Sequence, residues 1–173
     1  MKKALLLVAI AFLSPAAFGQ AVKIGVVAFI SGPAAAPFGV PAKQAADFVF
    51  EELNAGKVPG PYNKKGFGGA PIEMVMVDEA GTTTTQVTEF RNLVQKHNVD
   101  VVIGYISSGN CLAIAPVAEE LKKFTNFYDC GTPRIFEDGK YNYVFRTSPT
   151  ATMDSVGAAL YVKDAKPGVK SIA

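Results

Sequence analysis

Along this chain, short apolar runs typical of buried strands alternate with segments whose apolar residues recur at helical spacing. This alternation predicts an α/β fold. Residues 22–30, VKIGVVAFI, are almost all apolar and rich in β-branched side chains, and a turn at 31–33 ends them, so they predict a buried strand. From Pro41 the apolar residues recur at helical spacing up to residue 53, and Gly56 closes the pattern. This second segment predicts a helix packed on a sheet.

The same alternation continues along the rest of the chain. Further strands are predicted at 71–78, 99–106, 125–129 and 141–147. Further helices are predicted at 87–97, at about 111–123 and at 147–162, and loops at 56–70 and 130–140. Strands separated by helices of this length pair in parallel, with helices on both faces. The pattern therefore predicts a doubly wound parallel sheet.

The first 20 residues have the three-part layout of a secretory signal peptide. Lys2 and Lys3 precede an apolar stretch at 4–13, and small residues follow at 16–19. The apolar stretch is far shorter than the roughly 20 residues that span a bilayer. We therefore expect export to the periplasm, a mature chain that begins near Gln20 or Val22, and no membrane insertion of that chain. A buried N-terminal helix is the alternative.

Removal of a signal peptide changes the charge balance. The whole chain has 17 Lys and Arg against 15 Asp and Glu, and without Lys2 and Lys3 the basic residues also number 15. A neutral chain with both signs interspersed offers no electrostatic footprint for nucleic acid or for an anionic membrane surface. We therefore expect neither as a partner.

Cys111 and Cys130 are the two cysteines, and oxidation is the default in an exported protein. A disulfide between them and a pair of buried free thiols both fit the sequence. Their spacing matches neither a CxxC redox motif nor a zinc site, and the chain has a single histidine. We expect no metal and no cofactor.

Motifs for catalysis do not fit the sequence. It has no P-loop, and Ser107 is one residue out of register for a nucleophile elbow that would begin at Gly104. Asp78 and Glu79 are neighbours at a strand end, where they point apart, so loop hydrogen bonding is favoured over a catalytic pair. We expect a protein that is not an enzyme. A secreted hydrolase whose base lies outside these residues is the alternative.

Ligands of such sheets bind at the carboxyl ends of the strands, near a topological switch point. Three turns follow strands here, at 30–39, 105–110 and 129–134. In the second, GYISSGNC, the backbone N–H groups of a helix start and the hydroxyl of Ser108 or the amide of Asn110 can receive a carboxylate without any lysine. The same side chains could instead only cap the helix.

The segments VKIGVVAFISGPAA, PIEMVMVDEAG, VDVVIGYISSGNCLAIAPVAEE and YVFRTSPT together resemble the amino-terminal lobe of leucine/isoleucine/valine-type solute-binding proteins of ABC importers. The resemblance implies two lobes that close on a small solute and pass it to a permease in the inner membrane. It implies a first lobe over 21–148, and a hinge crossing with the start of a second lobe over 149–173. A ligand-sensing regulatory subunit of the same fold is an alternative.

The resemblance also implies site residues. Ser107, Ser108 and Gly109 correspond to the turn that holds a ligand carboxylate. Cys130, through its carbonyl, and Thr132, through its hydroxyl, correspond to the second turn. Phe38 stands where an aromatic residue faces the ligand. Phe38, Cys130 and the Pro-Arg pair after Thr132 depart from the amino-acid pattern, so the ligand could be a branched-chain amino acid, an aromatic acid, an amide or urea.

Overall fold

The fold is a single five-stranded parallel sheet in the order β2-β1-β3-β4-β5, which confirms the predicted doubly wound α/β class. The computed structural model describes residues 19–171, so most of the predicted signal peptide lies outside the described residues. The strands are β1 Val22–Ala28, β2 Ile72–Asp78, β3 Val101–Gly104, β4 Thr125–Phe127 and β5 Val144–Arg146. β1 pairs with β2 along its whole length and with β3 on its other side, so it is an interior strand.

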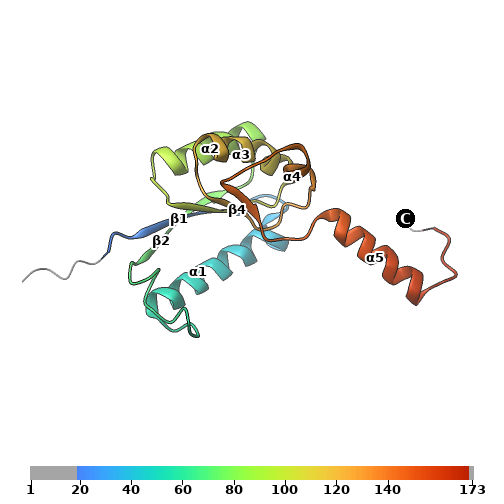
Figure 1. The fold of residues 1–173 in the computed structure, drawn as a ribbon, viewed down its shortest axis with the longest axis horizontal. Coiled ribbons are helices and arrows are strands. Elements are labelled where there is room, and N and C mark those ends of the chain that lie inside the picture. The colour runs from blue at the N-terminus through green and yellow to red at the C-terminus, as the bar shows by residue number, and fades with distance from the viewer. Residues whose placement is uncertain (1–18, 172–173) are drawn as a thin grey trace, which may run out of the picture.

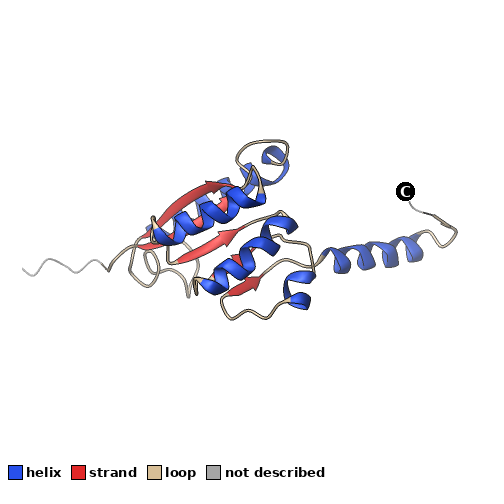
Figure 2. Ribbon diagram, turned by 90° about the horizontal axis from the view of Figure 1, so that it is seen from above, coloured by secondary structure: helices blue, strands red, loops and turns tan. Residues whose placement is uncertain are grey.

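Helices cover both faces of the sheet, as the crossover connections require (Figures 1 and 2). The helical elements are η1 Ala35–Gly39, α1 Val40–Ala55, α2 Thr83–Gln95, α3 Ser108–Glu120, α4 Arg134–Asp138 and α5 Ala151–Ala165. Figure 1 shows α1 on one side of the sheet and α2 with α3 on the other. Arg91 of α2 donates to both carboxylate oxygens of Glu120 of α3, at 3.0 and 2.7 Å.

The main core lies between the sheet and the pair α2–α3. Phe90, Leu93, Val102, Ile114 and Phe127 are among its fully buried side chains. Burial of each such side chain is worth about 1.5–3 kcal/mol. The α2–α3 face is therefore the closely packed side of the domain.

The other face is less completely covered. Beside β4 and β5 the rings of Phe124 and Phe145 stack with centroids 4.9 Å apart, yet they remain 44% and 45% exposed. Helix α5 projects away from the sheet (Figure 1), and its apolar Leu160 and Tyr161 are exposed. No described helix is both long and apolar enough to cross a membrane.

Some element boundaries differ from the sequence-based prediction. Helix α3 begins at Ser108 instead of near residue 111, because the side chain of Ser107 accepts a hydrogen bond from the Asn110 N–H and starts the helix earlier. The loop predicted at 130–140 contains the short helix α4. Residues 167–171, the last that the structure describes, form no strand.

A disulfide joins Cys111 in the first turn of α3 to Cys130 in the turn after β4. Their Cα atoms are 6.4 Å apart, and both residues are fully buried. The bond thus links two turns at the carboxyl edge of the sheet.

We predict that a double Cys111→Ala, Cys130→Ala variant loses roughly 3 kcal/mol of unfolding free energy, because a cross-link between residues 19 apart restricts the unfolded chain. Urea unfolding of the two proteins measures the loss. Thiol titration of the denatured, unreduced wild type checks the bond itself, and two free thiols would contradict it.

Candidate functional site

The candidate site lies at the carboxyl edge of the sheet, where the strand order reverses. β1 sits between β2 and β3, so the chain leaves β1 toward one side and β3 toward the other. Such a switch point separates two neighbouring turns and leaves a crevice between them. The turns after β1, β3 and β4 all end at this edge.

The turn after β3 is held tightly against β1. Gly104 lies so close to β1 that a Cβ there would be 2.5 Å from the carbonyl oxygen of Val27. Tyr105 follows with a left-handed φ of 69°, and its N–H donates to the same carbonyl at 3.1 Å. A left-handed backbone at a bulky residue costs of order 1 kcal/mol or more, so the surroundings must impose it.

Ser107 caps helix α3, and this leaves Ser108 and Gly109 free. The Ser107 hydroxyl accepts from the Asn110 N–H at 3.4 Å. The N–H groups of Ser108 and Gly109 are first-turn donors with no intrahelical acceptor. Within residues 19–171 they have no hydrogen-bond partner, and neither does the Ser108 hydroxyl. Two backbone donors and one hydroxyl are therefore available at the helix start, where the helix dipole favours an anion.

Glu79 accepts hydrogen bonds from the residues just before α3 and from Asn110 in its first turn. Its carboxylate accepts from the N–H groups of Ile106 and Ser107, both at 2.8 Å, and from Asn110 Nδ2 at 3.2 Å. Glu79 is fully buried. Burial raises the pKa of Glu79, the charge of Asp78 adds to this, and the three hydrogen bonds oppose it.

Asp78 holds the turn after β1 in the same way. Its Oδ1 accepts from the Ile30 N–H at 2.9 Å, and its Oδ2 accepts from the Ser31 hydroxyl at 2.6 Å. Burial would raise the pKa of Asp78, but hydrogen bonds from Ser31, Ala80 and Ile30 outweigh it and lower the pKa. The two adjacent carboxylates thus serve two different turns, which agrees with the interpretation as loop hydrogen bonding.

Asn110 is directed inward. It is 5% exposed, donates to Glu79, and accepts from the Thr83 hydroxyl at 3.3 Å. Its side chain is used within the protein, so the alternative of Asn110 as the carboxylate donor is not supported by its contacts.

The turn after β4 carries Cys130 and Thr132. Arg146 Nη1 donates to the carbonyl oxygens of both residues, at 3.1 and 2.6 Å. Its guanidinium also lies over the ring of Phe136, with 5.4 Å to the centroid. Each carbonyl keeps one further lone pair for a ligand. The Thr132 hydroxyl accepts from the Arg134 N–H at 3.3 Å and can still donate.

Phe38 belongs to the turn after β1. It is 49% exposed in η1, next to Gly39. A Cβ at Gly39 would overlap the carbonyl of Phe29, so only glycine allows the turn to fold back this closely. The site residues expected from sequence therefore lie on three turns of one edge. Glu79 and Arg146 were not among the expected site residues. The sequence did place Glu79 beside Asp78 at a strand end and predicted loop hydrogen bonding for both.

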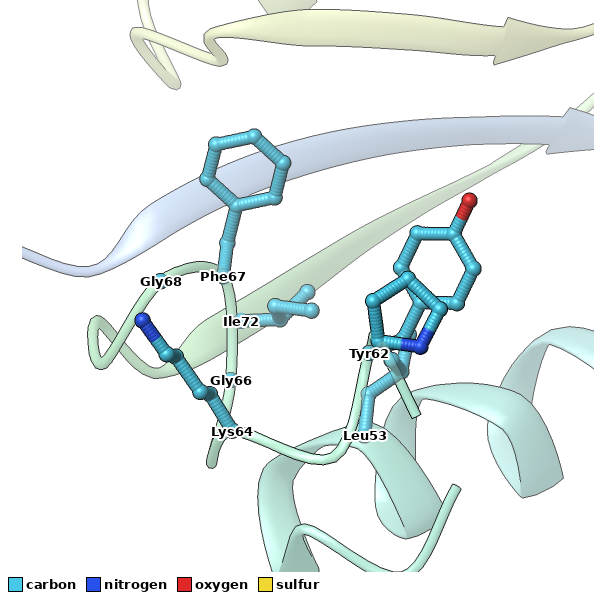
Figure 3. Close-up of a pocket in the computed structure, with 8 residues that line it drawn as sticks. Leu53, Tyr62, Lys64, Gly66, Phe67, Gly68 and Ile72 are labelled. Carbon is cyan, nitrogen blue, oxygen red and sulfur yellow. The ribbon is translucent and has the colours of Figure 1, made fainter. Parts of the chain in front are cut away.

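A hollow on the surface lies elsewhere and does not form part of this site. Figure 3 shows Leu53, Tyr62, Phe67 and Ile72 around it. Leu53 is near the end of α1 and Ile72 begins β2, so this hollow is at the amino edge of the sheet. Among residues 19–171 no group of three or more His, Cys, Asp or Glu side chains is placed to hold a metal.

Comparison with known proteins identifies the family of this chain. A sequence profile of the family described as periplasmic binding protein matches residues 21–173. A Rhodopseudomonas palustris ABC transporter solute-binding protein, solved with 4-hydroxybenzoate, is 28% identical with a TM-score of 0.70, over 85% of this chain and 37% of that one. Another from R. palustris, solved with benzoate, is 25% identical with a TM-score of 0.69, over 84% and 38%.

A third structure shares the fold at lower identity. It is the branched-chain amino acid transporter substrate-binding protein of Streptococcus pneumoniae, solved with isoleucine, at 24% identity and a TM-score of 0.64, over 76% of this chain and 34% of that one. No curated protein matches the chain. The chain spans 34 to 38% of the length of these solved proteins. From the match over residues 21–173, this chain belongs to the periplasmic binding protein family.

Proposed function

We propose that this protein is the solute-binding component of an ABC importer and captures a small carboxylate-bearing solute. The proposal rests on the N–H groups of Ser108 and Gly109 and the Ser108 hydroxyl, which have no hydrogen-bond partner within residues 19–171 and lie at the switch point of the sheet. These groups can donate to a carboxylate at a helix N-terminus. The role is binding without chemistry.

An aromatic acid is the favoured ligand. The structures solved with 4-hydroxybenzoate and benzoate are 28% and 25% identical to this chain, while the one solved with isoleucine is 24% identical. Phe38 adds a half-exposed ring on the neighbouring turn. Aromatic pairs prefer offset or edge-to-face packing, which such a ring can provide for a benzoate. A branched-chain amino acid is the second choice.

Residues 21–148 would form the first lobe, and residues 149–173 the hinge crossing and the start of a second lobe. Closure of two lobes on the solute would bury it, and opening would release it to a permease in the inner membrane. A donor set without lysine suits release, because the first lobe alone holds the solute weakly. The proposed signal peptide at 1–20 would place the protein in the periplasm.

Calorimetric titration of the intact mature protein tests the proposal. The ligands are 4-hydroxybenzoate, benzoate, L-isoleucine and L-leucine, with benzamide as a neutral control. We expect saturable binding of at least one acid and weaker binding of benzamide, because the donors favour a charged acceptor. Absence of binding across all four acids would contradict the proposed function. Loss of uptake of the bound acid on gene deletion would separate transport from sensing.

We predict that Ser108→Ala and Thr132→Val each weaken binding of the preferred acid about 10- to 100-fold. Each change removes a hydrogen bond to a charged group, worth roughly 1.5–3 kcal/mol. Unliganded thermal stability should change little, because the Ser108 hydroxyl has no partner among the described residues and the Thr132 hydroxyl accepts only one long hydrogen bond, from the exposed N–H of Arg134 at 3.3 Å. Calorimetry and thermal unfolding of the same samples measure both effects, and unchanged affinity in both variants would rule out this set of contacts.

Ser107→Ala is the matched control for stability. Ser107 is the N-cap of α3, so its hydroxyl loss should cost about 1 kcal/mol of unfolding free energy. Ser108→Ala, one residue later, should lower the unfolding free energy much less. Equal stability losses in Ser107→Ala and Ser108→Ala would show that the cap is assigned to the wrong serine.

A further inference from the structure

We infer that Glu79 is a positioning residue for solute binding: its buried carboxylate fixes the turn after β3 so that the N–H groups of Ser108 and Gly109 face the solute. This inference rests on the proposed function and names how its site is held. It is carried by the contacts of Glu79 and by the path that the side chain takes across the sheet edge.

The side chain of Glu79 crosses the end of β1. Glu79 follows β2, whereas the N–H groups that it accepts, on Ile106 and Ser107, follow β3. β1 lies between these strands and ends at Ala28. The Glu79 N–H donates to the Ala28 carbonyl at 2.8 Å, so its backbone is anchored on β1 while its side chain reaches over to β3. One residue ties three strands together at the switch point.

The contacts of Glu79 divide the donors of the helix start. Its two oxygens take the N–H groups of Ile106 and Ser107, and Asn110 closes the third contact from within α3. The next donors along the chain, Ser108 and Gly109, remain for the solute. Without Glu79, four consecutive N–H groups would lie unpaired, and the left-handed turn at Tyr105 would be held only by its contacts with β1.

The surroundings of Glu79 indicate a role in geometry more than in stability. Within the described residues no cation pairs with it, and Asp78 adds like charge. The hydroxyls of Tyr105 and Tyr128 are buried close enough to Glu79 to feel its charge, and they have no hydrogen-bond partner within the described residues. Burial raises the pKa of both phenols, and the charge of Glu79 raises it further. A buried carboxylate kept under these conditions contributes little net stability, but it fixes the position of its donors.

Glu119 provides a matched control because it makes the same kind of contact at the opposite edge. Its carboxylate accepts from the N–H groups of Asn142 and Tyr143, at 2.8 and 3.0 Å, and from Asn142 Nδ2 at 2.7 Å. Tyr143 directly precedes β5, so this contact lies at the amino edge of the sheet, away from the solute. Both glutamates hold two consecutive N–H groups and one asparagine.

The experiment compares Glu79→Gln, Glu79→Asp and Glu119→Gln in the intact mature protein. Glutamine replaces one carboxylate oxygen with an NH₂ group, which cannot accept from the N–H groups of Ile106 and Ser107. Aspartate keeps the charge, but its side chain is one methylene shorter. Amide hydrogen exchange without ligand should accelerate about tenfold at Ile106 and Ser107 in both Glu79 variants, and at Asn142 and Tyr143 in the Glu119 variant. Affinity for 4-hydroxybenzoate should fall at least about tenfold only in the Glu79 variants.

The outcomes separate this inference from the proposed function. If the wild type binds 4-hydroxybenzoate and both Glu79 variants bind it equally well, the inference is overturned and the function stands. Equal loss of affinity in Glu119→Gln also overturns it, because the effect is then general destabilisation. If exchange at Ile106 and Ser107 is unchanged, the proposed hold on the turn is wrong. If the wild type binds none of the four acids, the inference fails together with the function.

Discussion

The site depends on a buried carboxylate that has no positive partner among the described residues. An ionised group out of water costs several kcal/mol unless hydrogen bonds satisfy it, and Glu79 obtains these bonds only when the turn after β3 takes one conformation. The left-handed Tyr105, the close approach at Gly104 and the early start of α3 at Ser108 are parts of that conformation. Any other path of the turn would leave the carboxylate or its donors unpaired.

Similar links hold the remaining turns of the same edge. Asp78 ties the turn after β1 to β2, the disulfide ties α3 to the turn after β4, and Arg146 ties that turn to β5. Each link joins residues far apart in sequence, so each restricts a turn relative to a neighbouring strand. The turns of a binding protein need this restriction, because side chains that are ordered before binding lose less entropy when the solute arrives.

The sequence predicted the fold because periodicity is a local property. Buried parallel strands such as β1 read as continuous apolar runs, and α1 shows helical spacing closed by Gly56 with a left-handed φ of 69°. The contacts of the site are not local. Glu79 meets residues 27 to 31 positions away, and Arg146 meets carbonyls 14 and 16 positions away. No pattern of neighbours reveals such contacts, so Ser108 could be expected as a donor, while its support by Glu79 could not.

The position of Glu79 also limits how strongly one lobe can hold an anion. Its charge already compensates part of the positive end of α3, and a solute carboxylate bound at Ser108 and Gly109 would approach the same helix end. The dipole therefore supplies less attraction than at a vacant helix start, and like charge opposes the solute through a site that burial makes poorly screened. Under the proposed function, tight capture would have to come from contacts outside this edge, formed only when the solute is enclosed. A solute-binding protein needs that balance, since a lobe that bound the anion tightly alone would not release it on opening.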